Sequence, residues 1–256
     1  QPPADLVVGT IPIPTNAMAG YEMALTYVLH NQGTNGAFGP WVDALYFSAD
    51  DQWDIGDTLF TRVGQGGFLA PGGSRTNTVS APAPGVVPGD YRVIIRTDIV
   101  NQVPETNEFN NITATLDQVA TEVDELVFGV PSIGSITPGR SVYYRFSATS
   151  GQTIRVLFNA QLPESASQVF VGSSVIPTRG QFHYTFNDPF VSSGELIMPA
   201  KQTGVYFILI HGGLGTSSFA IQVDPLSFLI TRSSPNAAGD SGVVTLKVEG
   251  AWPTTD

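Results

Sequence analysis

The sequence contains no cysteine and few positively charged residues. The absence of cysteine from 256 residues excludes disulfides, thiolate metal sites and cysteine nucleophiles together. Only 11 lysines and arginines stand against 22 aspartates and glutamates, so the formal net charge is −11. Because nucleic-acid phosphates are bound by basic surfaces, we expect no nucleic-acid partner. No apolar run approaches the ~20 residues that span a bilayer, so we expect no membrane insertion.

Residues that fill helix surfaces are also scarce. Charged residues make up 13% of the chain, about half of the roughly 25% that is typical. Glycine and proline are abundant, at 27 and 19 residues. This composition indicates many turns and favours strands over helices.

Strand patterns recur along the whole chain and are bounded by Gly, Pro, Asn and Asp clusters. Four of the clearest runs are Met23–Leu29, Tyr91–Thr97, Val142–Phe146 and Val205–Ile210. The one helical periodicity is weak and lies near residues 116–127. Many short strands at close spacing predict an all-β protein built of antiparallel β-sandwiches in tandem.

Charge is distributed unevenly and suggests three segments. Residues 1–121 contain 4 basic and 12 acidic residues, whereas residues 122–225 contain 5 and 7. The last segment, residues 226–256, contains 2 and 3 and begins after Asp224-Pro225, where a strand meets a proline. We therefore predict one domain over residues 1–121, a second over residues 122–225 and a partial unit over residues 226–256.

The first segment resembles a known family at several separated motifs. These motifs are Asp5–Val8, Leu29–Gly33, Leu45–Asp50, Asp54–Leu59 and Val103–Asn111. In this order they resemble the cell-adhesion-related domain of bacterial surface proteins, over about residues 5–118. The resemblance implies an immunoglobulin-like sandwich in an extracellular bacterial repeat, with an adhesive role and no catalytic residues.

The second segment is similar to another family. The motifs are Gly134–Gly139, Val142–Phe146, Ser150–Ile154, Val169–Gly172, Ile176–Thr178 and Gly204–Ile210. They resemble the bacterial pre-peptidase C-terminal domain. This resemblance implies a jelly-roll-like sandwich of the kind that is appended to secreted hydrolases and surface proteins.

The last segment looks like the first two strands of an immunoglobulin-like repeat. The strand patterns are Phe228–Thr231 and Gly242–Gly250. A complete sandwich needs about seven strands and roughly 100 residues, which these 31 residues cannot supply. They must pack on the second domain, pair with another chain or continue into further sequence.

Four aspartates form the most acidic stretch of the chain. Asp50, Asp51, Asp54 and Asp57 lie within eight residues. Calcium binds several carboxylate oxygens, so these residues are candidate calcium ligands. The alternative is a solvated turn in which Asp side chains bond the local backbone. Thr106–Asn111 is a second candidate with the same two interpretations.

Aromatic residues raise the question of a carbohydrate platform. Trp41, Trp53, Phe38 and Phe60 could stack against a sugar ring. The alternative is that they fill the core of the sandwich, as most aromatic residues in such folds do. Exposure of both tryptophans would support a polymer-binding role.

The residues Gly239–Gly242 match the nucleophile signature of trypsin-like proteases. That chemistry needs a histidine base and an orienting aspartate on a complete double barrel. The three histidines, His30, His183 and His211, lack the surroundings found in such proteases. We interpret the stretch as a glycine-rich turn and expect the chain to be no enzyme.

The sequence features above lead to two functional hypotheses. The first is a non-catalytic structural or adhesive segment of an exported bacterial surface or filament protein. Its partners would be further copies or neighbouring β-domains, joined through strands donated by residues 226–256. The alternative is an accessory region of a secreted hydrolase that binds a carbohydrate or protein polymer. Both place the protein outside the cell or at its surface. The start at Gln1-Pro2-Pro3, without an initiator methionine, fits a mature N-terminus.

Overall fold

The computed structural model describes residues 3–9, 11–162, 164–188, 190–227, 229–234, 245 and 247–251. These residues form strands, turns and loops without any helix, which confirms the predicted all-β class. Accordingly, none of them belongs to a helix that could cross a membrane. The chain divides into two compact units, Gln1–Val123 and Asp124–Asp256.

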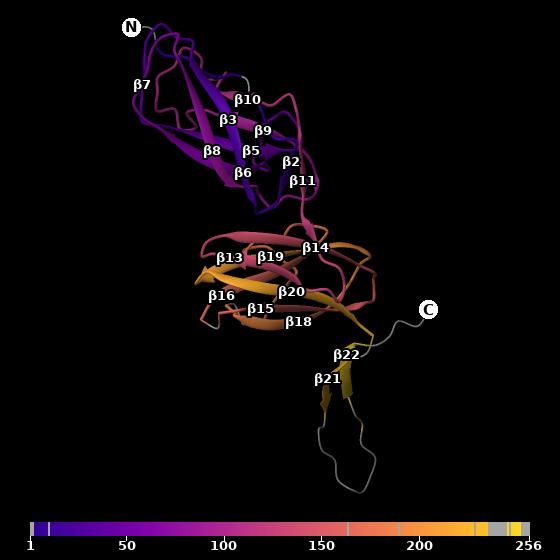
Figure 1. Ribbon diagram of the computed structural model, residues 1–256. Helices are drawn as coiled ribbons and strands as arrows, with labels where there is room; N and C mark the ends of the chain where they lie inside the picture. The colour runs from indigo at the N-terminus through magenta and orange to yellow at the C-terminus, as the bar shows by residue number, and fades with distance from the viewer. Residues whose placement is uncertain are drawn as a thin grey trace. The chain divides into compact units, whose positions relative to one another are not determined.

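The first unit is a sandwich of two principal sheets (Figure 1). One sheet has the order β1-β3-β8, formed by Leu6–Val8, Glu22–Asn31 and Ser74–Pro82. The other has the order β2-β11-β9-β5-β6, formed by Asn16–Met18, Val119–Glu122, Gly89–Arg96, Trp41–Ser48 and Thr58–Gln65. Strand β10, Ile112–Ala114, also pairs with β9, and the short strands Ala37–Phe38 (β4) and Phe68–Leu69 (β7) pair with each other.

Alternating apolar residues explain how these sheets enclose a core. In β3 the side chains of Met23, Leu25 and Leu29 are buried, and the residues between them are more exposed. Successive side chains of a strand point to opposite faces, so this pattern directs one face of β3 into the sandwich. Trp41 and Leu45 of β5 are fully buried in the same core.

The second unit is also a sandwich of two sheets. The first has the order β12-β14-β19-β16-β17, formed by Asp124–Glu125, Ser141–Ala148, Gly204–Leu214, Ala166–Ser173 and Tyr184–Thr185. The second has the order β13-β20-β15-β18, formed by Ser132–Ile136, Ser217–Leu226, Thr153–Ala160 and Ser193–Pro199.

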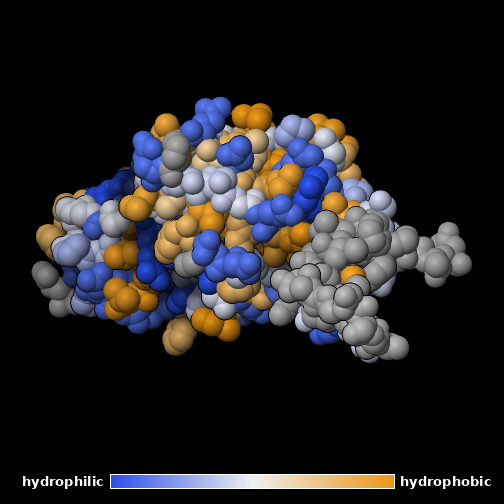
Figure 2. All heavy atoms as spheres, turned by 90° about the horizontal axis from the view of Figure 1, so that it is seen from below, coloured by the Kyte–Doolittle hydropathy of each residue, from blue (hydrophilic) through white to orange (hydrophobic). Residues whose placement is uncertain are grey.

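Aromatic rings from both sheets fill the core of the second unit. The rings of Phe146 and Tyr206 stack with their centroids 5.4 Å apart. Phe158 of β15 lies 5.4 Å from Phe219 of β20, again between ring centroids. Burial of such large side chains contributes about 1.5–3 kcal/mol each, so these rings account for much of the stability of this unit. On the face shown in Figure 2, hydrophobic residues are dispersed among hydrophilic ones.

A hairpin follows the last strand of the second sandwich. Strand β21, Leu229–Ser234, pairs antiparallel with β22, Lys247–Ala251, in a separate two-stranded sheet. Residues 235–244, which include Gly239–Gly242, lie outside the described residues. Strand β20 itself continues through Leu226.

Candidate binding site

Loops at one end of the first unit are held together by Asn31, a buried residue at the end of β3. Its side-chain oxygen accepts hydrogen bonds from the backbone N–H groups of Asp5 and Gly33, both at 3.0 Å. Its Nδ2 group donates to the carbonyl oxygens of Asn35, at 2.7 Å, and Leu69, at 3.1 Å. One side chain thus fixes the N-terminal segment and the loops that begin β4 and end β7.

A second loop at this end, residues 97–111, is fixed by buried carboxylates. Asp98 adopts a positive φ of 43° and accepts hydrogen bonds from the N–H groups of Gln102, at 2.9 Å, and Val103, at 2.7 Å. Glu105 accepts from the N–H of Leu6 and from Nδ2 of Asn111. The loop is therefore bonded both to itself and to β1.

Burial changes the acidity of Glu105. Only 9% of this residue is exposed. Desolvation raises the pKa of its carboxyl group to about 7, although its two hydrogen bonds lower that pKa. The charges of Glu108 and Asp98 raise it further.

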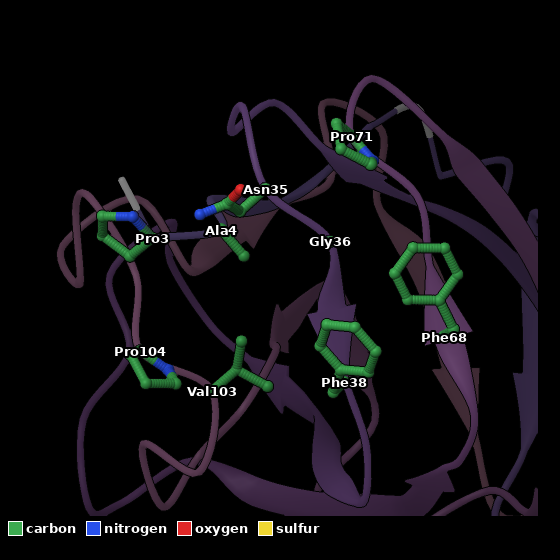
Figure 3. Close-up of a pocket in the computed structure, with 9 residues that line it drawn as sticks. All are labelled: Pro3, Ala4, Asn35, Gly36, Phe38, Phe68, Pro71, Val103 and Pro104. Carbon is green, nitrogen blue, oxygen red and sulfur yellow. The ribbon is translucent and has the colours of Figure 1, made fainter. Parts of the chain in front are cut away.

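Between these loops lies an apolar pocket of about 440 Å³. The two phenylalanines that line it, Phe38 and Phe68, remain 70% and 52% exposed. Their ring centroids are 4.8 Å apart, and Figure 3 shows Pro3, Val103 and Pro104 on the opposite side of the pocket. The other lining residues are Pro3, Ala4, Asn35, Gly36, Pro71, Val103 and Pro104.

The ring of Phe68 packs directly against the backbone of Gly36 beside the pocket. A Cβ atom on Gly36 would lie 2.0 Å from a ring carbon of Phe68. Asn35 is the one polar side chain among the residues that line the pocket. A site of this kind suits apolar groups, and its described lining residues include no acid, base or nucleophile.

The four aspartates predicted to bind calcium lie in the loop between β5 and β6. Asp50 and Asp54 accept hydrogen bonds from the N–H groups of Gln52, at 2.8 Å, and Gly56, at 2.6 Å. Asp57 accepts from the N–H of Asp54 at 3.0 Å, and Asp51 accepts from the side chain of Gln52 at 3.1 Å. Within the described part of the chain, no three acidic or histidine side chains are grouped as a metal site would require. The calcium site stays a prediction.

The second acidic candidate, Thr106–Asn111, bonds mainly to its own loop and to the segment just before β1. Asn107 accepts from the N–H of Phe109 at 3.1 Å, and Glu108 accepts from the N–H of Glu105 at 3.1 Å. Asn110 donates to the carboxylate of Asp5 at 2.9 Å. These contacts agree with the interpretation that these side chains satisfy the hydrogen-bonding groups of the loop backbone.

The aromatic residues considered for sugar stacking are not brought together. Trp41 is fully buried and Phe60 is 7% exposed, so both belong to the core. The guanidinium of Arg96 covers the ring of Trp53 at 3.7 Å from its centroid. Phe38 belongs to β4 and lines the pocket, where its ring contacts the ring of Phe68.

The histidines form no catalytic group in the described residues. His211 shares a 3.0 Å hydrogen bond between Nδ1 and the hydroxyl of Ser141, its partner on the neighbouring strand. Desolvation lowers the pKa of His211, which favours the neutral ring. His183 accepts from the N–H of Ser173 at 2.9 Å and caps a turn.

Two features of the first unit are not predicted from the sequence. Asp43 is fully buried and accepts hydrogen bonds from the side chains of Tyr27, at 2.7 Å, and Thr97, at 2.6 Å. In the sequence, Asp43 is the single acidic residue within the apolar run Trp41–Ser48, which is the feature that could have indicated a buried acid. Phe68 was also missed, although an aromatic directly after Gly66-Gly67 is a sign of an exposed turn residue.

Comparison with protein families supports the resemblance of the first segment. The family model described as CARDB matches residues 3–115. The description agrees with the cell-adhesion-related family expected there. The immunoglobulin-like repeat expected in residues 226–256 stays a prediction. No curated protein is significantly similar to the chain.

Several solved structures are similar to parts of the chain. The CARDB domain of a Pyrococcus furiosus protein, solved in complex with di-metal ions, is 22% identical and covers 47% of this chain and 90% of its own, with a TM-score of 0.35. The pre-peptidase C-terminal domain of a Bacillus anthracis collagenase is 12% identical and covers 40% of this chain and 95% of its own, with a TM-score of 0.32. The secreted serine protease VesC of Vibrio cholerae is 8% identical over 84% of this chain and 50% of its own, with a TM-score of 0.29.

Proposed function

We propose that this chain is a non-catalytic structural or adhesive segment of an exported bacterial surface or filament protein. The CARDB match supports an adhesion-like role for the first unit. Two β-sandwiches in series are suited to spacing and to contact between neighbouring domains, because their sheets end in edge strands that can pair.

The observation that carries this proposal is the hairpin β21–β22. Its two strands pair only with each other among the described residues. An isolated two-stranded hairpin is marginally stable in water, and a third strand stabilises it. A sheet edge of a neighbouring copy can supply that strand through main-chain hydrogen bonds. If the hairpin of one copy joins a different surface of the next, the contact does not close and a fibre grows.

Negative-stain electron microscopy tests this role of the hairpin. The intact chain is compared with a chain that ends at Ser227, just after β20. We expect elongated assemblies from the intact chain and none from the shortened chain. Equal assemblies from both chains would overturn strand donation by the last segment.

The pocket favours a second candidate function, an accessory region that holds a polymer for a secreted hydrolase. Exposed phenylalanines whose rings contact each other at the end of a sandwich are suited to binding. Because Asn35 is the pocket's only polar side chain, a protein polymer fits this lining better than a polysaccharide, whose hydroxyls need partners.

Co-sedimentation with insoluble collagen and with cellulose tests this second function. The double variant Phe38→Ala/Phe68→Ala should lose binding, whereas Phe109→Ala, which removes a 94% exposed ring outside the pocket, should retain it. Equal binding by both variants would exclude the pocket as the polymer site.

A further inference from the structure

Strand β8 is a long free edge of the first unit. It is the last strand in the order β1-β3-β8, and Figure 1 shows it beside β3. Its 9 residues pair with β3 in one continuous register, from Glu22↔Pro82 to His30↔Ser74. The register has no bulge, so the edge runs without interruption.

The register also determines which backbone groups of β8 are free to pair. The pairs that flank the ladder are hydrogen-bonded, with Asn31 N–H donating to Gly73 at 3.0 Å and Ala83 N–H donating to Tyr21 at 2.8 Å. Hydrogen-bonded and non-hydrogen-bonded pairs alternate along an antiparallel ladder. The odd-numbered residues of β8 therefore bond to β3. The even-numbered residues, Ser74, Thr76, Thr78, Ser80 and Pro82, direct their backbone groups away from it, although Pro82 has no N–H to donate.

From Ser74 to Ala81 the outer side of β8 lacks the features that normally protect an edge strand, and its one proline, Pro82, is the last residue of the strand. Its solvent-facing side chains are the small hydroxyl residues Ser74, Thr76, Thr78 and Ser80. The one charged residue, Arg75, points inward, where it donates to Gln65 and to the carbonyl oxygen of Gly66. Natural edges are usually blocked by outward charges, prolines or bulges.

Other edges of the two sandwiches carry such protection. Strand β6 pairs with β5 across a register shift between Leu45 and Tyr46. Strand β18 has 7 residues and contains the exposed Glu195. Strand β13 is only 5 residues long. Among the described strands, β8 thus combines the greatest edge length with the least protection.

We propose that β8 is the docking edge for a second copy of this chain, which adds its own β8 antiparallel about Thr78. The two sheets then join as β1-β3-β8-β8-β3-β1. This inference names a contact surface for the homotypic assembly proposed above and rests on that function. It is a two-fold contact, which closes into a dimer, whereas the hairpin contact extends a fibre.

The sequence of β8 is complementary to itself in this arrangement. Thr78 of one copy faces Thr78 of the other, and Thr76 faces Ser80, so every outward N–H meets an outward carbonyl. Arg75 faces Ala81, so no like charges oppose each other. Within one copy, the hydroxyl oxygens of Thr26 and Thr78 are 3.0 Å apart. In the dimer, the same two threonines of both copies form one row across the joint.

Charge variants of the chain that ends at Ser227, which lacks the hairpin, test the two-fold contact without fibre growth. In Thr78→Lys and in Thr78→Glu, like charges meet at the axis, so each variant alone should fall from the dimer to the mass of one shortened chain in sedimentation velocity. An equimolar mixture of the two should recover the dimer. Thr26→Lys, on the same sheet face one strand away, is the control and should remain dimeric. Dimers in either single variant, or a mixture that stays monomeric, would overturn the proposal.

A cysteine variant measures the same contact directly, because the natural chain has no cysteine. Hydrogen-bonded antiparallel partners have Cα atoms about 5.5 Å apart, within the ~4.4–6.8 Å that a disulfide spans. Thr78→Cys should therefore form a cross-linked dimer on mild oxidation. Thr26→Cys, about three strand spacings or ~14 Å from its counterpart, should not.

The outcomes separate this proposal from the proposed function. If Thr78→Cys fails to cross-link but fibres still depend on residues after Ser227, the β8 contact is wrong and strand donation stands. If Thr78→Cys cross-links and the shortened chain assembles as the intact chain does, the β8 contact stands and strand donation is wrong. Equal unfolding midpoints of variants and parent chain confirm that each variant is folded.

Discussion

Glu105 connects the first strand to the loop beside the pocket, and its burial makes that connection sensitive to pH. Its carboxylate accepts from Leu6 and Asn111, while Thr106 donates its backbone N–H to Ala4 at 2.7 Å. The folded state must hold this group in an environment that penalises its charge.

The first prediction is that Glu105→Gln flattens the pH dependence of stability. The folded pKa of about 7 exceeds the ordinary 4.5, so the folded state binds the proton more tightly than the unfolded state. The contribution of Glu105 to the free energy of unfolding is therefore full below pH 4.5 and is lost as the pH rises to about 7. Urea unfolding across this range measures the slope. If Glu105→Gln kept the parent's slope, the pH dependence could not be assigned to Glu105. Glu108→Gln is the control and should keep that slope.

The second prediction concerns the acidic loop. If Asp50, Asp51, Asp54 and Asp57 bind calcium, the thermal unfolding midpoint of the parent chain should fall by a few degrees on addition of a chelator. Asp54→Ala should lower the midpoint in calcium and should not respond to the chelator. A parent chain whose midpoint ignores both calcium and chelator leaves the loop as an Asx-type turn, in agreement with its internal hydrogen bonds.

At the scale of elements, the loops around the pocket depend on one side chain. The third prediction is that Asn31→Ala lowers the free energy of unfolding by about 1–3 kcal/mol, because buried partners such as Leu69 O and Gly33 N lose their hydrogen bonds. Hydrogen exchange should also rise in residues 32–36 and 69–73. Protection that stays unchanged there would show that packing alone holds these loops.

Two kinds of strand could be predicted from the sequence. The run Met23–Leu29 lies inside β3, because a half-buried strand imposes its period on the side chains. The run Val205–Ile210 lies inside β19 and is buried almost throughout, in agreement with its continuous apolar sequence. The weak helical period near residues 116–127 was misleading. There, Val119–Glu122 is a strand held between β2 and β9, so tertiary pairing overrides local preference.

The candidate site was harder to predict than the fold. Phe38 and Phe68 are separated by thirty residues, and their meeting depends on the pairing of β4 with β7, which only the folded chain reveals. Trp41 was placed among candidate platform residues, yet its position on β5 faces the core. Which edge of a sheet stays free depends on strand order, and composition gives no information on that.

For the whole molecule, net charge opposes association between copies. Each chain carries a formal charge of −11, so two copies repel each other at low ionic strength. Salt screens this repulsion, with a Debye length of about 10 Å at 0.1 M. The fourth prediction is that homotypic assembly strengthens as salt rises from about 10 mM to about 0.5 M, measured by light scattering. Assemblies that dissolve in salt would instead indicate attraction between opposite charges.

The most direct test of the account is the mass distribution of the intact chain in solution, measured by light scattering over a series of concentrations. We predict masses well above the 27.2 kDa of one chain that grow with concentration, and a shortened chain, ending at Ser227, that stops at the dimer. An intact chain that stays at 27.2 kDa at every concentration would contradict homotypic assembly and favour the polymer-binding function of the pocket.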